Sequence, residues 1–208
     1  LSSSSAASDV YKRQARAAAY AGVPVVLSIA GFDPTGGAGV GADLKVLAAH
    51  NCYGVAVVTC LTVQNTDGFE RRHDVPAALL SEQIAALAED IPLAGIKVGM
   101  LGCAANVEAV AATVERYPPP FLVLDPLLRS ANGAELLEAA GVQLLRQRLL
   151  PRATVVTPSM EEAEALTGQQ VQTVEEIKAA AVALHRAYGV QVVITGGHLE
   201  KLQDLFYD

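Results

Sequence analysis

The sequence predicts an α/β fold with a mostly parallel central sheet and helices on both of its faces. The first observation is a series of short runs that are apolar at every position, as in strands buried on both faces. The second is that stretches with helical periodicity separate most of these runs. The third is the lack of any internal repeat or obvious linker, which favours one doubly wound domain.

Each predicted strand is an apolar run bounded by glycine, proline or polar residues, and each predicted helix is rich in Ala, Leu and Glu. The strands are expected at Val23–Ala30, Gly54–Leu61, Gly95–Met100, Phe121–Asp125, Ala153–Thr157 and Val190–Thr195, with an edge strand at Gly68–Asp74. The helices are expected at Ala38–His50, Ala77–Glu89, Ala104–Arg116, Ala134–Leu149, Met160–Thr167 and Val174–Tyr188.

Composition excludes several classes of protein. The 208 residues carry a net charge of −7 and are 51% hydrophobic and 18% charged, which excludes a disordered chain. The acidic balance argues against a nucleic-acid partner, because phosphate contacts need clustered Lys and Arg. Three cysteines without a C-x-x-C motif favour a reducing compartment, and we expect a cytoplasmic protein. No apolar run approaches the ~20 residues that span a bilayer, so no membrane partner is expected.

The N-terminal region imitates a signal peptide, since basic residues at 12–16 precede an apolar stretch. We reject that interpretation because Pro24 interrupts the stretch, which then leads directly into a glycine-rich turn. Residues 1–14 are rich in Ser and Ala without apolar periodicity, and we interpret them as a disordered leader and a candidate non-native extension. Residues 15–208 are expected to form a single domain.

Ligands of such sheets bind beyond the carboxyl ends of the strands, where the first predicted strand runs into the glycine-rich segment 31–39. Its glycines allow a close backbone approach to a ligand, and the following helix start favours a negatively charged group. Gly37-x-Gly39-x-x-Ala42 also fits a dinucleotide-binding pattern, although no acidic residue follows the second strand to bind a ribose. A turn without any ligand is the remaining alternative. A P-loop is excluded because Gly-Lys-Ser/Thr does not occur.

Polar residues follow the other strands. The Gln64 amide offers a donor and an acceptor side by side, which matches a ring nitrogen next to an exocyclic amine, although an ordinary polar turn is the alternative. Asp125 follows the fourth strand, where a carboxylate can coordinate Mg²⁺ or cap a turn. Ser159-x-x-Glu162 is a capping box, yet its place after a strand leaves a metal role open for Glu162. Met100 fits either core packing or a ligand contact.

Seven segments in register resemble one family over about Val25 to Asp208. They are 30–39, Ala42-Asp43-Leu44-Lys45, Val63-Gln64-Asn65-Thr66, Lys97-Val98-Gly99-Met100-Leu101, Leu124-Asp125-Pro126, Thr157-Pro158 and Gly196-Gly197-His198. The family is the hydroxymethylpyrimidine/phosphomethylpyrimidine kinases of thiamine biosynthesis, within the ribokinase-like superfamily. The resemblance implies a ribokinase-like fold, a homodimer, and ATP- and Mg²⁺-dependent phosphorylation of 4-amino-5-hydroxymethyl-2-methylpyrimidine and then of its monophosphate.

The resemblance also implies roles for individual residues. The expected contacts of the aminopyrimidine are Gln64, Gly31, Asp43, Met100 and Leu127, the last near the reacting hydroxymethyl group. The expected metal-side carboxylates are Asp125 and Glu162. The expected ATP contacts are Thr195, Gly196 and Gly197.

The chain departs from the family pattern in three places. Ser159 stands where many relatives have Asn, and Thr195 where relatives commonly have Lys. The family's catalytic Gly-Thr-Gly-Cys turn does not occur before Asp208, so we expect the last part of the fold, with the catalytic residue, to be missing and phosphorylation by this chain to be poor. Two alternatives stay open: a pyridoxal-type kinase of the same superfamily, and a non-catalytic pyrimidine sensor.

Overall fold

Eight strands form one sheet in a computed structural model that describes residues 22–130, 133–196 and 203–208. The strands are β1 (Val25–Phe32), β2 (Tyr53–Gln64), β3 (Phe69–Asp74), β4 (Leu93–Val98), β5 (Leu122–Leu124), β6 (Val155–Val156), β7 (Gln191–Ile194) and β8 (Leu205–Tyr207). Their order is β3-β2-β1-β4-β5-β6-β7-β8. The six inner strands are parallel, and the edge strands β3 and β8 pair antiparallel with β2 and β7. The predicted mostly parallel sheet is confirmed, whereas β8 was not predicted.

The helices occupy nearly the ranges that periodicity predicted. They are α2 (Gly39–Ala49), α3 (Ala77–Asp90), α4 (Ala104–Arg116), α5 (Ala139–Leu144), α6 (Met160–Thr167) and α7 (Val174–Tyr188). A π-helical segment (Leu145–Leu149) and a 3₁₀ turn (Leu150–Arg152) continue α5. None of the described helices has the length and apolar character that a bilayer span needs.

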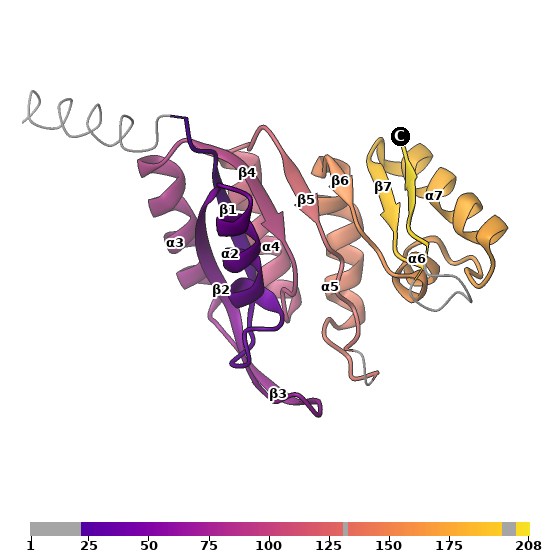
Figure 1. Ribbon diagram of the computed structural model, residues 1–208, viewed down its shortest axis with the longest axis horizontal. Coiled ribbons are helices and arrows are strands. Elements are labelled where there is room, and N and C mark those ends of the chain that lie inside the picture. The colour runs from indigo at the N-terminus through magenta and orange to yellow at the C-terminus, as the bar shows by residue number, and fades with distance from the viewer. Residues whose placement is uncertain (1–21, 131–132, 197–202) are drawn as a thin grey trace, which may run out of the picture.

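Helices cover both faces of the sheet, as the alternation of side chains along β2 shows. A Cβ built on Gly54 would lie 2.6 Å from Leu44 Cδ2, so this face of β2 lies directly against α2. Val57, three residues further along β2, points to the opposite face and belongs to the main buried core together with Leu80 of α3 and Val107 of α4. In Figure 1, α2 accordingly lies in front of β1 and β2, with α3 and α4 behind them.

The helix predicted for 134–149 begins only at Ala139, and its first part is extended chain instead. Glu135 forms an antiparallel bridge with Arg129, and the Leu136 N–H donates to the Leu128 carbonyl at 2.9 Å. Leu136 joins a small cluster with Cys60 and Met100, whereas Leu137 belongs to the main core. The segment is rich in Ala, Leu and Glu, which predicted a helix, but its two adjacent leucines pack into two different clusters.

Candidate active site

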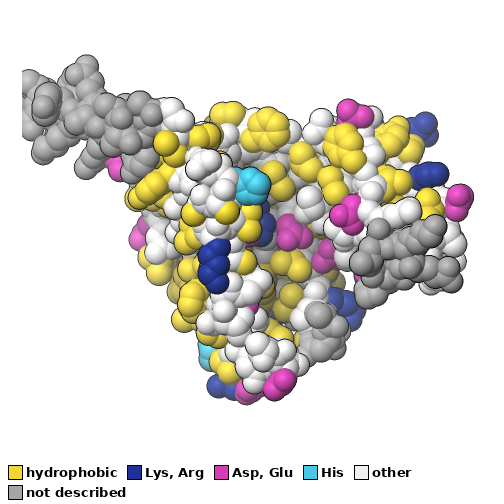
Figure 2. All heavy atoms as spheres, in the orientation of Figure 1, with side chains coloured by type: hydrophobic (Ala, Val, Ile, Leu, Met, Phe, Trp, Pro, Cys, Tyr) yellow, Lys and Arg dark blue, Asp and Glu magenta, His cyan; other side chains and the backbone are white. Residues whose placement is uncertain are grey.

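The strand order reverses between β1 and β4, because the chain adds β2 on one side of β1 and β4 on the other. Such a switch point opens a crevice at the carboxyl ends of the strands. Two adjoining cavities lie there, of about 400 Å³ and about 1270 Å³, and Asp125, Leu127 and Ser130 line both. Figure 2 shows this face hollowed between its α2 half and its α6 half, with acidic side chains gathered in the hollow.

The smaller cavity brings together all five residues expected to contact a pyrimidine: Gln64, Gly31, Asp43, Met100 and Leu127. They come from the ends of β1 and β2, from α2, and from the segments after β4 and β5. A Cβ on Gly31 would lie 3.0 Å from Cys60 Sγ and 3.3 Å from Met100 Sδ, so a larger residue would push these sulfur atoms apart. The five residues line the same cavity, and their role as substrate contacts stays a prediction.

Asp33 organises the glycine-rich segment, a role that sequence reasoning missed. One carboxylate oxygen accepts from the Thr35 N–H at 2.8 Å, and the other accepts from the Thr35 hydroxyl at 2.8 Å and the Ala38 N–H at 2.9 Å. Burial opposes ionisation of this 5% exposed residue, yet these hydrogen bonds and one from the Gln64 side chain hold its pKa below the usual value. A carboxylate only accepts, so a Gln64 side chain turned toward Asp33 would face it with the amide nitrogen.

Position 39, the first residue of α2, has no room for a side chain because β1 lies directly against it. Its φ is +57°, and a Cβ at this position would lie 2.0 Å from the Gly31 carbonyl oxygen. An antiparallel bridge between Phe32 and Gly39 fixes this approach. The glycine therefore lets the loop fold back onto β1, a structural requirement that the dinucleotide pattern did not anticipate.

A half-buried ion-pair cluster lies beside the smaller cavity. Lys97 Nζ of β4 lies 3.0 Å from Asp43 Oδ2 and 3.9 Å from Asp125 Oδ2, and the Ser28 hydroxyl donates to Asp43 at 2.6 Å. Burial raises the pKa of Asp125, Lys97 lowers it, and the Asp43 charge raises it further. Lys97 was not named as a site residue, although a charged residue inside an apolar strand was the signal that could have identified it.

Glu162 links α6 to the segment that follows β5. Its Oε2 accepts from the Ser159 N–H at 2.8 Å, and the Ser159 hydroxyl accepts from the Glu162 N–H, so the predicted capping box is present. Its Oε1 accepts from the Leu128 N–H at 3.2 Å. Burial raises the pKa of this carboxyl, and the hydrogen bonds from Ser159 and Leu128 oppose the shift. Glu162 lines the larger cavity together with Asp125.

The residues expected to contact ATP have three different placements. Thr195 lines the larger cavity, and its N–H donates to the Pro158 carbonyl at 3.1 Å. The Gly196 N–H donates to Asp204 Oδ1 at 3.3 Å, and Gly196 does not line either cavity. Gly197 lies outside the described residues.

An irregularity in the β2–β3 pairing places an aromatic ring beside Gln64. Val63 pairs with Arg71 and Gln64 with Phe69, so Glu70 is an extra residue on β3. Such bulges re-aim side chains next to binding sites. Phe69 and Gln64 both line the smaller cavity, and Phe69 packs against the Cys60–Met100–Leu136 cluster. The sequence predicted an edge strand here without indicating that it contributes to the cavity.

Several known proteins with similar sequences are named as pyrimidine kinases or thiamine biosynthesis proteins. The family described as phosphomethylpyrimidine kinase matches residues 33–208. A thiamine biosynthesis bifunctional protein of Geobacter sulfurreducens is 42% identical over 174 residues, which are 84% of this chain and 36% of that protein. A hydroxymethylpyrimidine/phosphomethylpyrimidine kinase of Aquifex aeolicus is 38% identical over 186 residues, which are 88% of this chain and 73% of that protein. The chain thus spans about a third of the first relative and about three quarters of the second.

Solved structures agree with the ribokinase-like fold class. A phosphomethylpyrimidine kinase from Clostridium difficile aligns with a TM-score of 0.82 at 34% identity, covering 88% of this chain and 80% of that one. A pyridoxal kinase from Staphylococcus aureus, solved with pyridoxal, aligns with a TM-score of 0.79 at 30% identity, covering 89% and 68% of the two chains. With the family match spanning most of its length, this chain belongs to the phosphomethylpyrimidine kinase family.

Proposed function

We propose that the smaller cavity binds 4-amino-5-hydroxymethyl-2-methylpyrimidine or its monophosphate, that the larger cavity binds ATP, and that the family reaction transfers the γ-phosphoryl group between them. The observation that carries the proposal is that the five predicted pyrimidine contacts line one cavity, which shares Asp125, Leu127 and Ser130 with a second, larger one. Two ligands that react with each other need adjoining sites of this kind.

Recognition of the pyrimidine depends on the Gln64 amide. Gln64 lines the cavity, and its amide hydrogen and carbonyl oxygen offer a donor to a ring nitrogen and an acceptor to an exocyclic amine. Phe69 and Met100 supply apolar and aromatic surface for the ring. The cavity therefore matches an aminopyrimidine in both its polar and its apolar parts.

The proposed reaction asks the chain mainly for positioning and charge control. With the alcohol as substrate, the hydroxymethyl oxygen forms a bond to the γ-phosphorus, the bond from that phosphorus to the ADP oxygen breaks, and the hydroxyl proton passes to solvent. With the monophosphate, a phosphate oxygen takes the place of the hydroxymethyl oxygen as the attacking group. Lys97 holds Asp43 and Asp125 in fixed positions next to the reacting groups.

The carboxylates fit a magnesium ion that the nucleotide helps to bind. Among the described residues, no group of three or more His, Cys, Asp or Glu side chains is arranged for a metal. Mg²⁺ is commonly held by one or two carboxylates together with substrate phosphates and water. Asp125 and Glu162, which both line the larger cavity, would supply these carboxylates. Bound there, the ion would neutralise charge on the transferring phosphates.

A pyridoxal-type kinase is the second candidate, because solved pyridoxal kinases align with TM-scores of about 0.8. Gln64 distinguishes the two, since its amide pairs with an aminopyrimidine edge. Competition between pyridoxal and the hydroxymethylpyrimidine in a titration calorimeter separates them, and tighter pyridoxal binding would favour the second candidate.

Gln64→Leu tests the proposed function directly. The variant keeps the approximate size of the side chain but leaves the polar edge of the pyrimidine unpaired, so the affinity should fall at least tenfold, or about 1.4 kcal/mol. Calorimetric titration with the hydroxymethylpyrimidine measures the change. Gln83→Leu, at an exposed position of α3, is the matched control and should bind like the parent chain. Equal affinities of parent and Gln64→Leu chains would contradict the proposal.

We further propose that the protein works in the cytoplasm as a homodimer, without a nucleic-acid or membrane partner. The three cysteines are free thiols, as expected in a reducing compartment. The dimer rests on the family resemblance, and sedimentation velocity measures it. A monomer at micromolar concentration would contradict that part of the proposal.

A further inference from the structure

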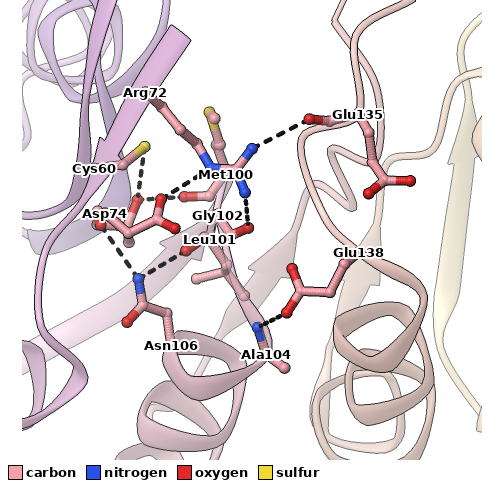
Figure 3. Close-up of polar contacts among 11 residues, drawn as sticks. Cys60, Arg72, Asp74, Met100, Leu101, Gly102, Ala104, Asn106, Glu135 and Glu138 are labelled. Carbon is pink, nitrogen blue, oxygen red and sulfur yellow. Dashed lines mark hydrogen bonds and ion pairs between the residues drawn. The ribbon is translucent and has the colours of Figure 1, made fainter.

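Three segments of the chain meet at one arginine on the β3 edge strand. Arg72 Nη2 donates to the Gly102 carbonyl at 2.6 Å, Nη1 donates to the Glu135 carbonyl at 3.2 Å, and Nε donates to Asp74 Oδ1 at 2.9 Å. Figure 3 shows the guanidinium between these three acceptors. The side chain is 22% exposed, and of the three hydrogen bonds the one to Gly102 is partly shielded from water.

The Gly102 backbone fits tightly against this pair of side chains. Its φ is +84°, and a Cβ there would lie 2.4 Å from Asp74 Oδ1 and 3.4 Å from Arg72 Nε. A residue with a side chain would therefore displace either the loop or the Arg72–Asp74 pair. The loop after β4 is thus built to lie directly on β3.

The segments that Arg72 joins carry part of the wall of the smaller cavity. Met100 lies two residues before Gly102, and Leu136 is adjacent to Glu135. Both side chains are buried, line the cavity and pack with Cys60 in one cluster. β3 itself adds Phe69 to the same wall. Three apolar residues of this wall, Met100, Leu136 and Phe69, are therefore close in sequence to Arg72 or to a group that it binds.

Other contacts hold the same loop from its far side. The Thr59 hydroxyl donates to the Met100 carbonyl, and the Asn106 amide donates to the Leu101 carbonyl at 2.9 Å. The Glu138 carboxylate accepts from the Ala104 N–H at 2.7 Å. Figure 3 shows the Asn106 and Ala104–Glu138 contacts toward the start of α4, away from Arg72. They link the loop to β2, α4 and the residue before α5, so loss of Arg72 should loosen the wall without unfolding it.

We propose that Arg72 is a positioning residue for the pyrimidine cavity, which clamps β3 to the Met100 loop and the Leu136 segment. The inference rests on the proposed function and deepens it, because it names the residue that holds the apolar side of the pyrimidine cavity in place. A guanidinium suits this task because its planar, rigid donors can bind several acceptors in fixed directions. When the wall is already ordered before the ligand binds, binding does not have to pay the entropy of ordering these side chains and loops.

Arg72→Met tests the clamp, because methionine keeps a long side chain and removes all the donors. We expect the affinity for the hydroxymethylpyrimidine to fall about tenfold, the equivalent of about 1.4 kcal/mol. The affinity for a non-hydrolysable ATP analogue should stay within about twofold. Arg72 touches the larger cavity only through the backbone carbonyl of Glu135, whereas Met100, Leu136 and Phe69 near it line the smaller cavity. Both affinities are measured by calorimetry on the same preparation.

Arg71→Met is the matched control, since Arg71 is the neighbouring, largely exposed residue and pairs with Glu70 on its own strand. It should leave both affinities unchanged. Arg72→Lys restores a positive donor that reaches fewer acceptors at once, so it should recover part of the lost pyrimidine affinity. Hydrogen exchange of segments 100–104 and 134–138 should be faster in Arg72→Met than in the parent chain.

The outcomes separate this inference from the proposed function. A parent chain that does not bind the pyrimidine contradicts the proposed function, and the clamp with it. A parent chain that binds, with an Arg72→Met variant that binds equally well, contradicts the clamp alone. Equal losses of pyrimidine and nucleotide affinity would show a general structural role and also overturn the inference. If Arg72→Met does not fold, Arg72→Lys decides: affinity like that of the parent chain would contradict the clamp.

Discussion

At the scale of single residues, Asp33 offers a test of how the glycine-rich loop is held. Asp33→Asn removes the negative charge and replaces one accepting oxygen by a donor, so some of the hydrogen bonds from Thr35 and Ala38 are lost and the others weaken. We expect the free energy of unfolding to fall by about 1–3 kcal/mol, measured by urea denaturation at neutral pH. Asp67→Asn, in the exposed turn between β2 and β3, is the control and should have little effect.

The same variant has a defined pH dependence. The pKa of Asp33 is lowered in the folded chain, so its carboxylate stabilises the fold above the pKa of the unfolded chain, about 3.9. That stabilisation is lost as pH falls through the still lower folded pKa. The stability gap between parent and variant should therefore shrink below about pH 4. A gap that stays constant into that range would contradict the role of the ionised carboxylate.

Sequence reasoning selected candidate site residues whose chemistry is visible in isolation and missed residues that act through their neighbours. Gln64 and Asp125 lie at or just after strand ends and carry groups with obvious ligand chemistry. Gln64 lines the smaller cavity, and Asp125 lines both. Asp33 looked like part of an ordinary turn, because its partners are backbone N–H groups that no sequence pattern displays. Arg72 is likewise one of several charged residues on an edge strand, and only the fold shows that it reaches Gly102 and Glu135.

At the scale of elements, the two capping boxes form a natural comparison. Ser159 and Thr173 each cap a helix with the same pattern, but only Ser159 and its partner Glu162 line the larger cavity. Ser159→Ala and Thr173→Ala should each lower the free energy of unfolding by about 1 kcal/mol. Only Ser159→Ala should also weaken binding of a magnesium–nucleotide analogue, by about fivefold, the equivalent of about 1 kcal/mol.

Thermal unfolding and nucleotide titration of both capping variants measure these effects. Equal weakening by Thr173→Ala would show that loss of stability, rather than the position of Glu162, controls nucleotide affinity. If neither variant binds more weakly, the α6 cap has no part in the nucleotide site. The two variants are matched because both boxes have the same reciprocal hydrogen bonds.

Elements with strong local signals were predicted almost to the residue. α6 and α7 begin after Ser159 and Thr173 and end before glycines in the left-handed conformation, and their ranges match the expected ones. β8 was missed because it is only Leu205–Tyr207, too short for periodicity to reveal. The bulge at Glu70 was missed because pairing register depends on contacts between strands.

At the scale of the whole molecule, the order of strands explains why residues distant in sequence meet. The reversal between β1 and β4 places the ends of four parallel strands around one crevice, so Gly31, Gln64, Met100 and Asp125 come together there. Alternating strands and helices predicted the parallel sheet, and the general rule for such sheets predicted the edge at which the two cavities lie. The sizes of the two cavities and the residues that line both of them could be seen only in the folded structure.

The placement of Asp125 in that crevice predicts a conflict between stability and function. Burial raises its pKa, so the folded chain binds a proton at Asp125 more readily than the unfolded chain does, and stability falls as pH rises through this window. Asp125→Asn removes that penalty, while Lys97 keeps its closer partner Asp43 at 3.0 Å. The variant should therefore be as stable as the parent chain near neutral pH, or more stable by up to about 1 kcal/mol, and the difference should shrink as pH falls.

The same substitution should abolish tight binding of the magnesium–nucleotide analogue, because it removes a carboxylate that lines both cavities. In the parent chain, protons compete with the metal at Asp125, so that binding should weaken as pH falls through the raised pKa. Urea denaturation and nucleotide titration between about pH 4 and about pH 8 measure both properties. A variant that is clearly less stable than the parent chain at neutral pH would show that the 3.9 Å pairing with Lys97 outweighs the desolvation of Asp125. A variant that still binds the magnesium–nucleotide as tightly would exclude Asp125 from the metal side of the site.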